Sequence, residues 1–447
     1  MEVPHWPQAF LRRMQQKFAD PAAYEAFKQA LAGQRTTGLR VNPLKTSIER
    51  FLEVVPFRLD PVPWCSDGFY YDETVDLPGR HPLHAAGVFY IQEPSAMSVV
   101  PALDIQPGQW VLDLCAAPGG KSTQIAGQLQ HDGLLVANEI HPMRVKALGE
   151  NLERWGTPTA VITQEDPSRL AEAWGPVFQR VLLDAPCSGE GMFRKDEDAV
   201  TTWSEQKIAE LASLQSSLLH AAHRLLAPGG ILVYSTCTFN TRENEEQIAA
   251  FLDQTADMSL QRQERLWPHT VRGEGHFYAV LVKDRATQPL AMPSQTVAAL
   301  NVSQKQLWQA FQRQFLHRFP LLDQGRFSLQ ARGQYLYLAP PVLPNLDRLK
   351  VLRSGVQVGQ FKKDRFEPTH GLAMLLQPED AKAGLALAAE DPKLRSYLEG
   401  QVLPGSSERG WGLISTGGHS LGWAKASGGS WKNHYPKGLR WRQGLAR

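Results

Sequence analysis

The sequence contains little cysteine and no long apolar run. Its 447 residues include four cysteines, at positions 65, 115, 187 and 237, which are too few for a disulfide scaffold and form no CxxC pair for zinc. No stretch approaches the roughly 20 apolar residues of a membrane helix, and the beginning, MEVPHWPQAF, lacks the basic and apolar regions of a signal peptide. We therefore expect no metal, no membrane span and a reducing cytoplasm, where cysteines serve packing or chemistry.

The composition is that of a soluble globular protein, with 43% hydrophobic and 21% charged residues. The length predicts two to four domains. The formal net charge is only +2, but it hides an uneven distribution. Residues 409–447 contain no Asp or Glu, so that the remaining chain is net acidic. The cations of this C-terminal segment are Arg409, Lys425, Lys432, Lys437, Arg440, Arg442 and Arg447.

Aromatic residues are interleaved with these cations: Trp411, Trp423, Trp431, Tyr435 and Trp441. Cations with interleaved aromatics suit phosphate contact together with base stacking, which favours RNA binding. The alternative is a small β-barrel whose tryptophans form its core. Both hold together if the aromatics pack while the cations face RNA.

The middle of the chain, from about residue 110 to 283, alternates short apolar runs with helix-like stretches. Residues 110–114, 134–137, 180–183 and 231–234 are typical of buried strands, and Ser204–Leu226 has apolar residues at helical spacing. Strands that alternate with helices predict an α/β fold with a parallel sheet covered on both faces. In such sheets the ligand lies beyond the carboxyl ends of the strands.

The regions on either side of this core are less regular. About 85 residues precede it and contain the segment LRVNPLKTS at 39–47. After the core, residues 286–297 are rich in Pro, Gln, Ser and Thr, which predicts a linker. The third region contains an alternating, strand-like stretch at 334–339 and a basic, Gly-interrupted stretch at 349–368 that predicts short strands.

A glycine-containing loop within 110–129, WVLDLCAAPGGKSTQIAGQL, joins a predicted strand to a predicted helix. Two adjacent glycines let the backbone approach a ligand closely, and the helix N-terminus offers free N–H groups. Neither GxGxxG nor the phosphate loop GxxxxGK[ST] is present. Acidic residues Asp113, Glu139, Asp166 and Asp184 follow successive predicted strands, which favours a ligand with a ribose diol and a positive sulfonium.

Two of the cysteines also follow predicted strands, Cys187 in LLDAPCSGEG and Cys237 in VYSTCT. Carbon 5 of cytosine is a poor nucleophile, and a thiolate that adds to carbon 6 turns the ring into an enamine that can accept a methyl group. An adjacent acid that donates or shares a proton at the ring nitrogen helps this addition, and Asp184 is suitably placed. A second basic group must remove the proton on carbon 5, and Cys187 is a candidate for it or for its helper. Cys65 and Cys115 are interpreted as packing residues.

The motifs CAAPGGK, DAPCSGEG and YSTCT, in this order and spacing, resemble the Sun/Nop (NSUN-type) family of RNA 5-methylcytosine methyltransferases. LRVNPLK and GVFYIQEPSAM resemble the N-terminal motifs of that family, and residues 353–368 and KNHYPKGLRW resemble its bacterial RsmF branch, which modifies 16S ribosomal RNA. The resemblance covers nearly the whole chain. It implies that Cys237 is the nucleophile and that Cys187 acts in product release.

The resemblance also implies S-adenosylmethionine (SAM) as cofactor. It assigns cofactor binding to Cys115, Ala116, Ala117, Pro118, Gly119, Gly120, Lys121, Glu139, Asp166 and Asp184. The implied fold is a seven-stranded, Rossmann-like class I methyltransferase core. We expect an N-terminal RNA-binding region at 1–85, the core at 86–285, a linker and intermediate RNA-binding domain at 286–370, and a PUA-like β domain at 371–447. The expected partner is the small (30S) ribosomal subunit, and the expected state is a monomer.

Other functions remain possible from the motifs. A DNA cytosine methyltransferase would use its Pro-Cys cysteine as nucleophile and needs no Thr-Cys partner, and an amino-group methyltransferase would carry an Asn/Asp-Pro-Pro-aromatic loop where this chain has DAPC. A non-catalytic ribosome-assembly factor is a further alternative, as is a methyltransferase acting on tRNA or another RNA. Retention of both cysteines favours catalysis.

Overall fold

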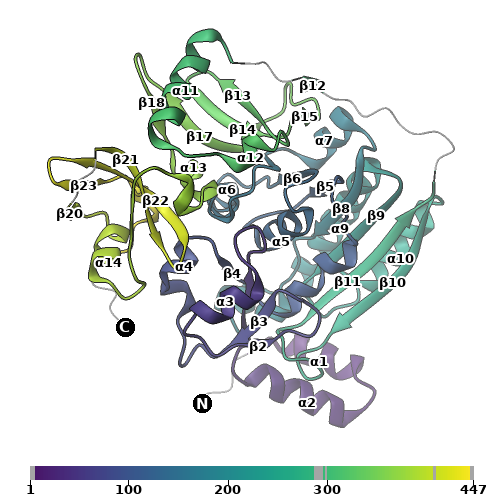
Figure 1. Cartoon of the computed structure of the whole chain (residues 1–447). Coiled ribbons are helices and arrows are strands. Elements are labelled where there is room, and N and C mark those ends of the chain that lie inside the picture. The colour runs from purple at the N-terminus through teal and green to yellow at the C-terminus, as the bar shows by residue number, and fades with distance from the viewer. Residues whose placement is uncertain (1–5, 286–294, 297–299, 406–408, 443–447) are drawn as a thin grey trace.

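The computed structural model describes residues 6–285, 295–296, 300–405 and 409–442. Its centre is an eight-stranded sheet in the order β10-β11-β9-β8-β5-β6-β7-β16 (Figure 1). Strands β5 to β9 pair in parallel, whereas β10, β11 and β16 run antiparallel to their neighbours. The strands are β5 (Trp110–Asp113), β6 (Leu134–Asn138), β7 (Ala160–Thr163), β8 (Phe178–Asp184), β9 (Leu226–Thr236), β10 (Met258–Leu266), β11 (His276–Lys283) and β16 (Val351–Ser354).

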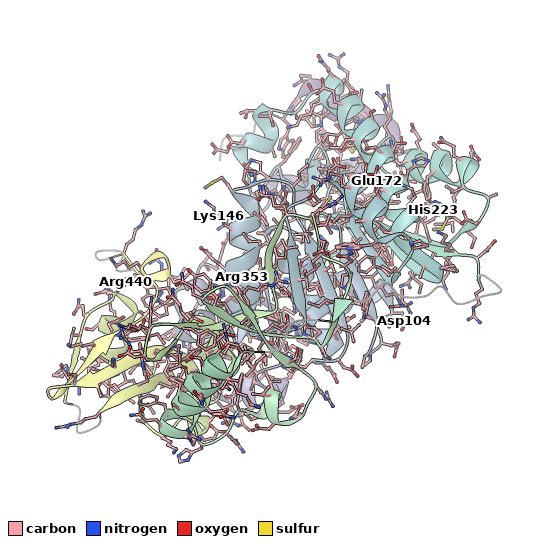
Figure 2. The ribbon with its side chains drawn as sticks, turned by 90° about the horizontal axis from the view of Figure 1, so that it is seen from above. Asp104, Lys146, Glu172, His223, Arg353 and Arg440 are labelled. Carbon is pink, nitrogen blue, oxygen red and sulfur yellow. The ribbon has the colours of Figure 1, made fainter. Side chains whose placement is uncertain are left out.

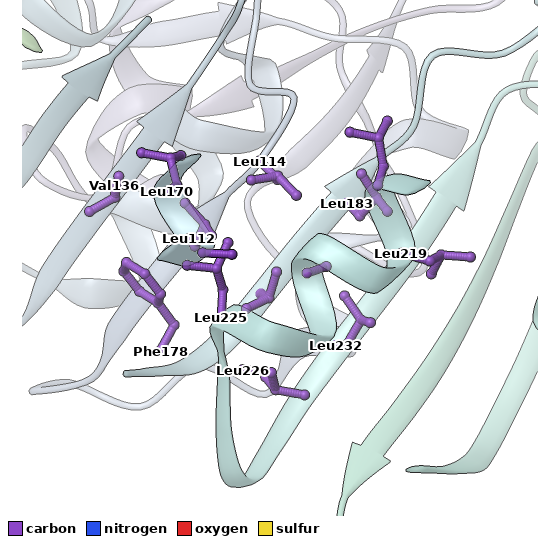
Figure 3. Close-up of a cluster of buried hydrophobic side chains, with 14 of the residues drawn as sticks. Leu112, Leu114, Val136, Leu170, Phe178, Leu183, Leu219, Leu225, Leu226 and Leu232 are labelled. Carbon is purple, nitrogen blue, oxygen red and sulfur yellow. The ribbon is translucent and has the colours of Figure 1, made fainter. Parts of the chain in front are cut away.

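Helices cover both faces of this sheet, as predicted. Successive residues of each strand point to opposite faces, so the buried strands supply apolar side chains to two cores. The helices on one face are α7 (Pro167–Trp174), α9 (Glu205–Leu225) and α10 (Glu245–Gln254), and those on the other are α5 (Gly120–Leu129) and α6 (Arg144–Trp155). Figure 3 shows the first core, where Leu219 and Leu225 of α9 lie over Leu183 and Leu232 of the strands.

The long helix predicted at 204–226 is confirmed as α9. Ser204 is its N-cap, and its side chain accepts a hydrogen bond from the backbone N–H of Lys207. Leu218, Leu219 and Leu225 recur on one face of the helix and are buried against the sheet, whereas Leu214 is exposed. Among the described residues, no helix combines the length and apolar character that crossing a membrane requires.

The N-terminal region forms a helical hairpin and a small sheet in the order β2-β3-β1-β4. The hairpin packs on the core beside Phe193, Trp203 and Phe239, and Arg13 forms a salt bridge with the buried Glu190. The elements are α1 (Gln8–Lys17), α2 (Pro21–Ala32), β1 (Thr37–Val41), α3 (Ile48–Val54), β2 (Asp60–Pro61), β3 (Gly68–Tyr71), α4 (Pro82–Ala85) and β4 (Phe89–Ile91).

The region after the core begins with helices and a second small sheet in the order β13-β14-β17-β18. The strands expected at 334–339 and within 349–368 are confirmed. Most of the expected linker at 286–297 lies outside the described residues. The elements are β12 (Gln295–Thr296), α11 (Val302–Phe315), α12 (Pro320–Asp323), β13 (Ser328–Arg332), β14 (Tyr335–Ala339), β15 (Val342–Leu343), β17 (Val356–Phe361) and β18 (Phe366–Pro368).

Strand β16 of this region does not pair with the small sheet beside it in sequence but with the core sheet. It pairs with the edge strand β7, so the seven expected strands are present and an eighth is added. Arg353, labelled in Figure 2 between the C-terminal part and the core, forms a salt bridge with Glu153 of α6. An exposed edge strand presents unpaired backbone groups, and β16 satisfies those of β7. This contact fastens the C-terminal regions to the core.

The C-terminal region is a five-stranded sheet in the order β19-β21-β22-β23-β20 with short helices. It shares one apolar core with the N-terminal sheet and another with α11, β14 and β17. The N-terminal and C-terminal regions therefore pack on each other. The elements are α13 (His370–Leu375), β19 (Gly384–Ala386), α14 (Pro392–Leu398), β20 (Leu403–Pro404), β21 (Gly410–Thr416), β22 (His419–Ser427) and β23 (Ser430–Asn433).

The aromatic residues of the C-terminal segment belong to these cores. Trp411, Trp423, Trp431 and Tyr435 are each less than 7% exposed, and Trp441 packs against the same cluster. For the four buried aromatics the structure supports the core alternative over base stacking, since an aromatic face that is packed in a core offers no surface to a base; Trp441 is only partly buried. The cations differ: within the described part of 409–442, none of them forms a salt bridge with a carboxylate.

Candidate active site

The loop after β5 is fixed by backbone and side-chain hydrogen bonds. Ala116 N–H donates to the carbonyl of Asn138 at 2.8 Å, and the Arg144 guanidinium donates to the carbonyl of Ala117 at 2.6 Å. Gly119 has a φ of +112° and forms the N-cap of α5, a conformation that a side chain would strain. The loop thereby turns sharply from strand to helix at the carboxyl edge of the sheet.

A pocket of 690 Å³ opens at this edge. Of the ten expected cofactor residues, Cys115, Ala117, Glu139, Asp166 and Asp184 line it, together with Cys187 and Cys237. Its other walls come from the loop after β8 and from α9, including Pro186, Ser188 and Leu214. Ala116, Pro118, Gly119, Gly120 and Lys121 belong to the loop without lining the pocket. The sequence reasoning did not anticipate the contribution of α9.

The acids at the strand ends have different surroundings. Glu139 is 4% exposed, accepts a hydrogen bond from His141 N–H and lies 3.5 Å from the Arg144 guanidinium. Asp166 is exposed, and its carboxylate caps α7 by accepting from Ser168 N–H at 2.8 Å. Asp113 lies beneath the loop, where its carboxylate accepts from the Ser122 hydroxyl at 2.6 Å. Asp113 therefore holds the loop, while Glu139 and Asp166 are available to the pocket.

Asp184, the last residue of β8, is held by two side chains. One carboxylate oxygen accepts from the Lys121 ammonium at 2.8 Å, and the other accepts from the Ser235 hydroxyl at 2.7 Å. Burial opposes ionisation of Asp184, but the Lys121 charge and the nearby His276 outweigh it and keep the pKa below its ordinary value. Asp184 is thus a carboxylate that accepts hydrogen bonds. This favours sharing over donation of a proton at the ring nitrogen.

The two strand-end cysteines meet at the pocket. The sulfur atoms of Cys187 and Cys237 are 3.4 Å apart, and both thiols are free. The hydrogen bond to Cys237, together with burial, raises the pKa of Cys187 well above its ordinary value. Cys187 therefore stays a thiol, in hydrogen-bond contact with the sulfur of Cys237. The Lys121 ammonium is close enough to Cys237 to interact with it electrostatically.

A buried carboxylate joins the loops that carry the two cysteines. Glu243 is fully buried and accepts from Ser188 N–H and Gln215 Nε2, both at 2.9 Å. Its second oxygen accepts from the Ser188 hydroxyl and the Asn240 amide. Ser188 directly follows Cys187, so Glu243 fixes the separation of the two sulfurs. Sequence reasoning missed this residue, because an acid in a run such as RENEE is usually a solvated surface residue.

The residues around the pocket fit the cofactor that the resemblance implies. The buried Glu139 carboxylate suits the two hydroxyls of a ribose, and the carboxylates of Asp166 and Asp184 suit a cationic ligand. Asp113 retains a buried carboxylate oxygen without a hydrogen-bond partner among the described residues, directly under the loop. These residues form an acidic, concave site at the sheet edge where α/β proteins bind nucleosides.

Family models match four consecutive parts of the chain. Residues 6–94 match the N-terminal domain of 16S rRNA methyltransferase RsmF, and residues 100–282 match 16S rRNA methyltransferase RsmB/F. Residues 310–376 match the first C-terminal domain of RsmF rRNA methyltransferase, and residues 385–441 match the methyltransferase RsmF PUA domain. The sequence-based fold, a class I methyltransferase core followed by a PUA domain, is confirmed.

Similar proteins match along nearly their full length. Ribosomal RNA small subunit methyltransferase F of Erwinia tasmaniensis is 35% identical over 97% of this chain and 96% of its own, and that of Cronobacter sakazakii is 35% identical with the same coverage. A solved methyltransferase homologue from Pyrococcus horikoshii is 27% identical, with a TM-score of 0.53 over 62% of this chain and 99% of its own. NSun6 from the same organism, 20% identical, shares the fold with a TM-score of 0.58 over 64% of this chain and 100% of its own. The chain belongs to the family of ribosomal RNA small subunit methyltransferase F.

Proposed function

We propose that this protein transfers a methyl group from SAM to carbon 5 of a cytosine in 16S ribosomal RNA, through a covalent bond between Cys237 and carbon 6. The observation that carries the proposal is the pair of sulfurs 3.4 Å apart at the pocket, beside the Lys121–Asp184 ion pair. A thiol, a second thiol, an ammonium and a carboxylate together meet the needs of this reaction. Family membership supports the RNA substrate.

The reaction begins at Cys237. Its thiolate adds to carbon 6, so that a carbon–sulfur bond forms and the π electrons of the carbon 5–carbon 6 bond move into the ring. Negative charge then develops on N3 and O2 of the base. The Asp184 carboxylate, held by Lys121 and Ser235, accepts a hydrogen bond from the amino group of cytosine, which orients the ring.

When bound, SAM supplies a methyl group on a positively charged sulfur, which carbon 5 of the activated ring accepts. Glu139, Asp166 and Asp184 are the carboxylates that would hold this ligand. Afterwards the proton on carbon 5 must leave and the carbon–sulfur bond must break. Cys187, whose sulfur already contacts that of Cys237 in the free protein, donates its S–H proton to the departing sulfur and takes up the proton from carbon 5 in its place.

The substrate and setting follow from the family and the charge distribution. The proposed partner is the small ribosomal subunit, the proposed location is the cytoplasm, and the proposed active state is a monomer. It also divides the chain at 85, 285 and 370 into an N-terminal RNA-binding region, a methyltransferase core, an intermediate domain and a PUA-like domain, which the ranges of the family models support.

Methylation of defined RNAs tests this function. The purified protein is incubated with methyl-labelled SAM and either 30S subunits, naked 16S RNA or tRNA, and labelled nucleosides are identified by mass spectrometry. We expect 5-methylcytosine at one position of 16S RNA, and none with Cys237→Ala. Label confined to tRNA would contradict the substrate, and absence of label from every RNA would favour the non-catalytic assembly factor.

A further inference from the structure

His276 lies next to the pocket residue Asp184, although no sequence motif pointed to it. It is the first residue of β11 and is 4% exposed. Its Nε2 atom is 3.8 Å from a carboxylate oxygen of Asp184, which is longer than a hydrogen bond. Within the described residues Nε2 has no hydrogen-bond partner. The imidazole is thus buried beside the catalytic carboxylate with one ring nitrogen unsatisfied.

The sheet register also brings His276 close to the nucleophile. In the antiparallel ladder of β9 and β11, Phe277 pairs with Thr236. Cys237 follows Thr236 and His276 precedes Phe277, so the two residues stand at neighbouring ends of adjacent strands. Asp184 at the end of β8 pairs with Ser235 on the other side of β9. The carboxylate, the nucleophile and the imidazole therefore occupy three adjacent strand ends.

A buried ring nitrogen without a hydrogen-bond partner carries a free-energy cost, because it has lost its contact with water and gained none in return. Burial, together with the Lys121 charge, lowers the pKa of His276, so its ring is neutral and has one N–H. The Asp184 carboxylate favours the tautomer whose N–H is on Nε2, because that proton faces the negative charge. Two further buried histidines, His370 and His419, also lack partners for their ring nitrogens, but both belong to the C-terminal region. His276 differs in lying beside Asp184 and at the strand end next to Cys237, both of which line the pocket.

We propose that His276 is a further catalytic residue, whose Nε2–H donates a hydrogen bond to N3 or O2 of the target cytosine while Asp184 accepts from its amino group. This proposal rests on the proposed function, since it adds a contact to the base that Cys237 attacks. The imidazole N–H and the carboxylate form a donor next to an acceptor. Cytosine presents the complementary pair, an acceptor at N3 next to a donor at N4.

The hydrogen bond acts on the addition step. When Cys237 adds to carbon 6, the displaced electron pair settles on N3 and O2, and a donor already in place stabilises that charge without reorganisation. The same pair of groups discriminates against uracil, which presents N–H at position 3 and an oxygen at position 4, so that donor would face donor and carboxylate would face oxygen. His276 therefore contributes to rate and to choice of base.

The rate of adduct formation tests this role. His276→Phe keeps a ring of similar size and removes the N–H, and His276→Gln keeps an N–H near the position of Nε2. Both are made in a Cys187→Ala background, where the adduct accumulates, and are mixed with 16S RNA and SAM in single-turnover experiments. We expect His276→Phe to form the adduct about 100- to 1,000-fold more slowly, with unchanged SAM affinity, and His276→Gln to recover at least about tenfold.

A matched control is His223→Phe in the same background. His223 forms the comparable His–Asp pair with Asp257, 3.0 Å away, at the end of α9 outside the pocket, and is labelled in Figure 2. We expect its adduct rate to equal that of the parent. If His276→Phe does not fold, His276→Asn replaces it, because the shorter amide cannot reach the position of Nε2. We then expect His276→Gln to form the adduct at least about tenfold faster than His276→Asn.

Several results would overturn the proposal. A parental adduct rate for His276→Phe, or equal rates for the Gln and Asn variants, would remove His276 from catalysis. Normal adduct formation followed by accumulation of adduct in the presence of Cys187 would place His276 in proton removal from carbon 5 instead. These outcomes are distinct from failure of the proposed function, in which the Cys187→Ala parent itself forms no adduct with 16S RNA.

Discussion

At the scale of single residues, the acids at the sheet edge differ in the side chains that surround them. Burial raises the pKa of Asp113 to about 7, with the Asp184 charge contributing and the Ser122 hydroxyl opposing. Asp184 remains ionised because Lys121 pairs with it. Glu139 keeps an oxygen directed to the pocket beside Arg144. Three acids that look alike in sequence therefore have different surroundings, and we propose that Asp113 holds the loop, that Asp184 contacts the base and that Glu139 binds the cofactor.

Glu139→Ala is expected to weaken SAM binding by about 10- to 100-fold, because hydrogen bonds between a hydroxyl and a carboxylate contribute about 1.5–3 kcal/mol. Isothermal titration calorimetry measures the dissociation constant directly. The matched control is Glu172→Ala, which removes an exposed carboxylate of α7 that does not line the pocket. Equal affinities of the two variants would exclude Glu139 from the cofactor site.

At the scale of elements, the two cysteine loops are tied together by Glu243. The groups of Ser188, Gln215 and Asn240 that contact its side chain all donate hydrogen bonds to it, so both of its buried oxygens have partners. A glutamine would place an amide N–H against one of these donors. We expect Glu243→Gln to lower the free energy of unfolding by about 2 kcal/mol and to slow methyl transfer by about 10- to 100-fold.

Chemical unfolding and single-turnover methylation measure the two effects. Glu246→Gln is the control, because Glu246 lies three residues further along the chain, is exposed and accepts only from the Thr241 hydroxyl among the described residues. If Glu243→Gln keeps the free energy of unfolding and the methylation rate of the wild type, the two sulfurs do not depend on the hydrogen bonds of Glu243 for their separation.

The strands and the residues that follow them could be predicted from sequence, whereas contacts between distant elements could not. Asp184, Cys187 and Cys237 follow apolar runs, and parallel topology brings such ends together. Glu243 and His276 carry no such local pattern. Their roles arise from pairing of β9 with β11 and from the fold of the loop after β9, which periodicity does not encode.

At the scale of the whole molecule, the N-terminal and C-terminal regions form one body beside the core. They share apolar residues such as Phe89, Leu394 and Trp431. The composition indicates a basic C-terminal segment but not its packing on the N-terminal sheet. Apolar residues in a sequence predict that a surface is buried, but not which other part of the chain covers it. The same limit applies to β16, which was expected as a short strand without the core sheet as its partner.

The exposed cations of the C-terminal region are expected to contact phosphates. Lys432→Glu combined with Lys437→Glu should weaken binding of 16S RNA and lower the slope of log affinity against log salt by about 1.5, since each phosphate contact contributes about 0.7–0.9. SAM affinity should not change. Filter binding at several salt concentrations measures the slope.

The control for the charge change is Arg224→Glu combined with Arg262→Glu, two exposed cations of the core outside the pocket. Because the net charge changes by the same amount, a general effect of charge would alter both slopes equally. Equal slopes in the two variants would contradict a specific RNA contact by the C-terminal region.

We propose that the two sulfurs, which lie 3.4 Å apart, have different roles: Cys237 attacks the base and Cys187 acts in product release. Cys187→Ala, incubated with 16S RNA and SAM and then digested with nuclease and protease, should yield a peptide containing Cys237 joined to a methylated cytosine, identified by mass spectrometry. Cys237→Ala should yield neither adduct nor product. An adduct on Cys187 in the Cys237→Ala variant, with normal turnover by Cys187→Ala, would contradict the account and reverse the two roles.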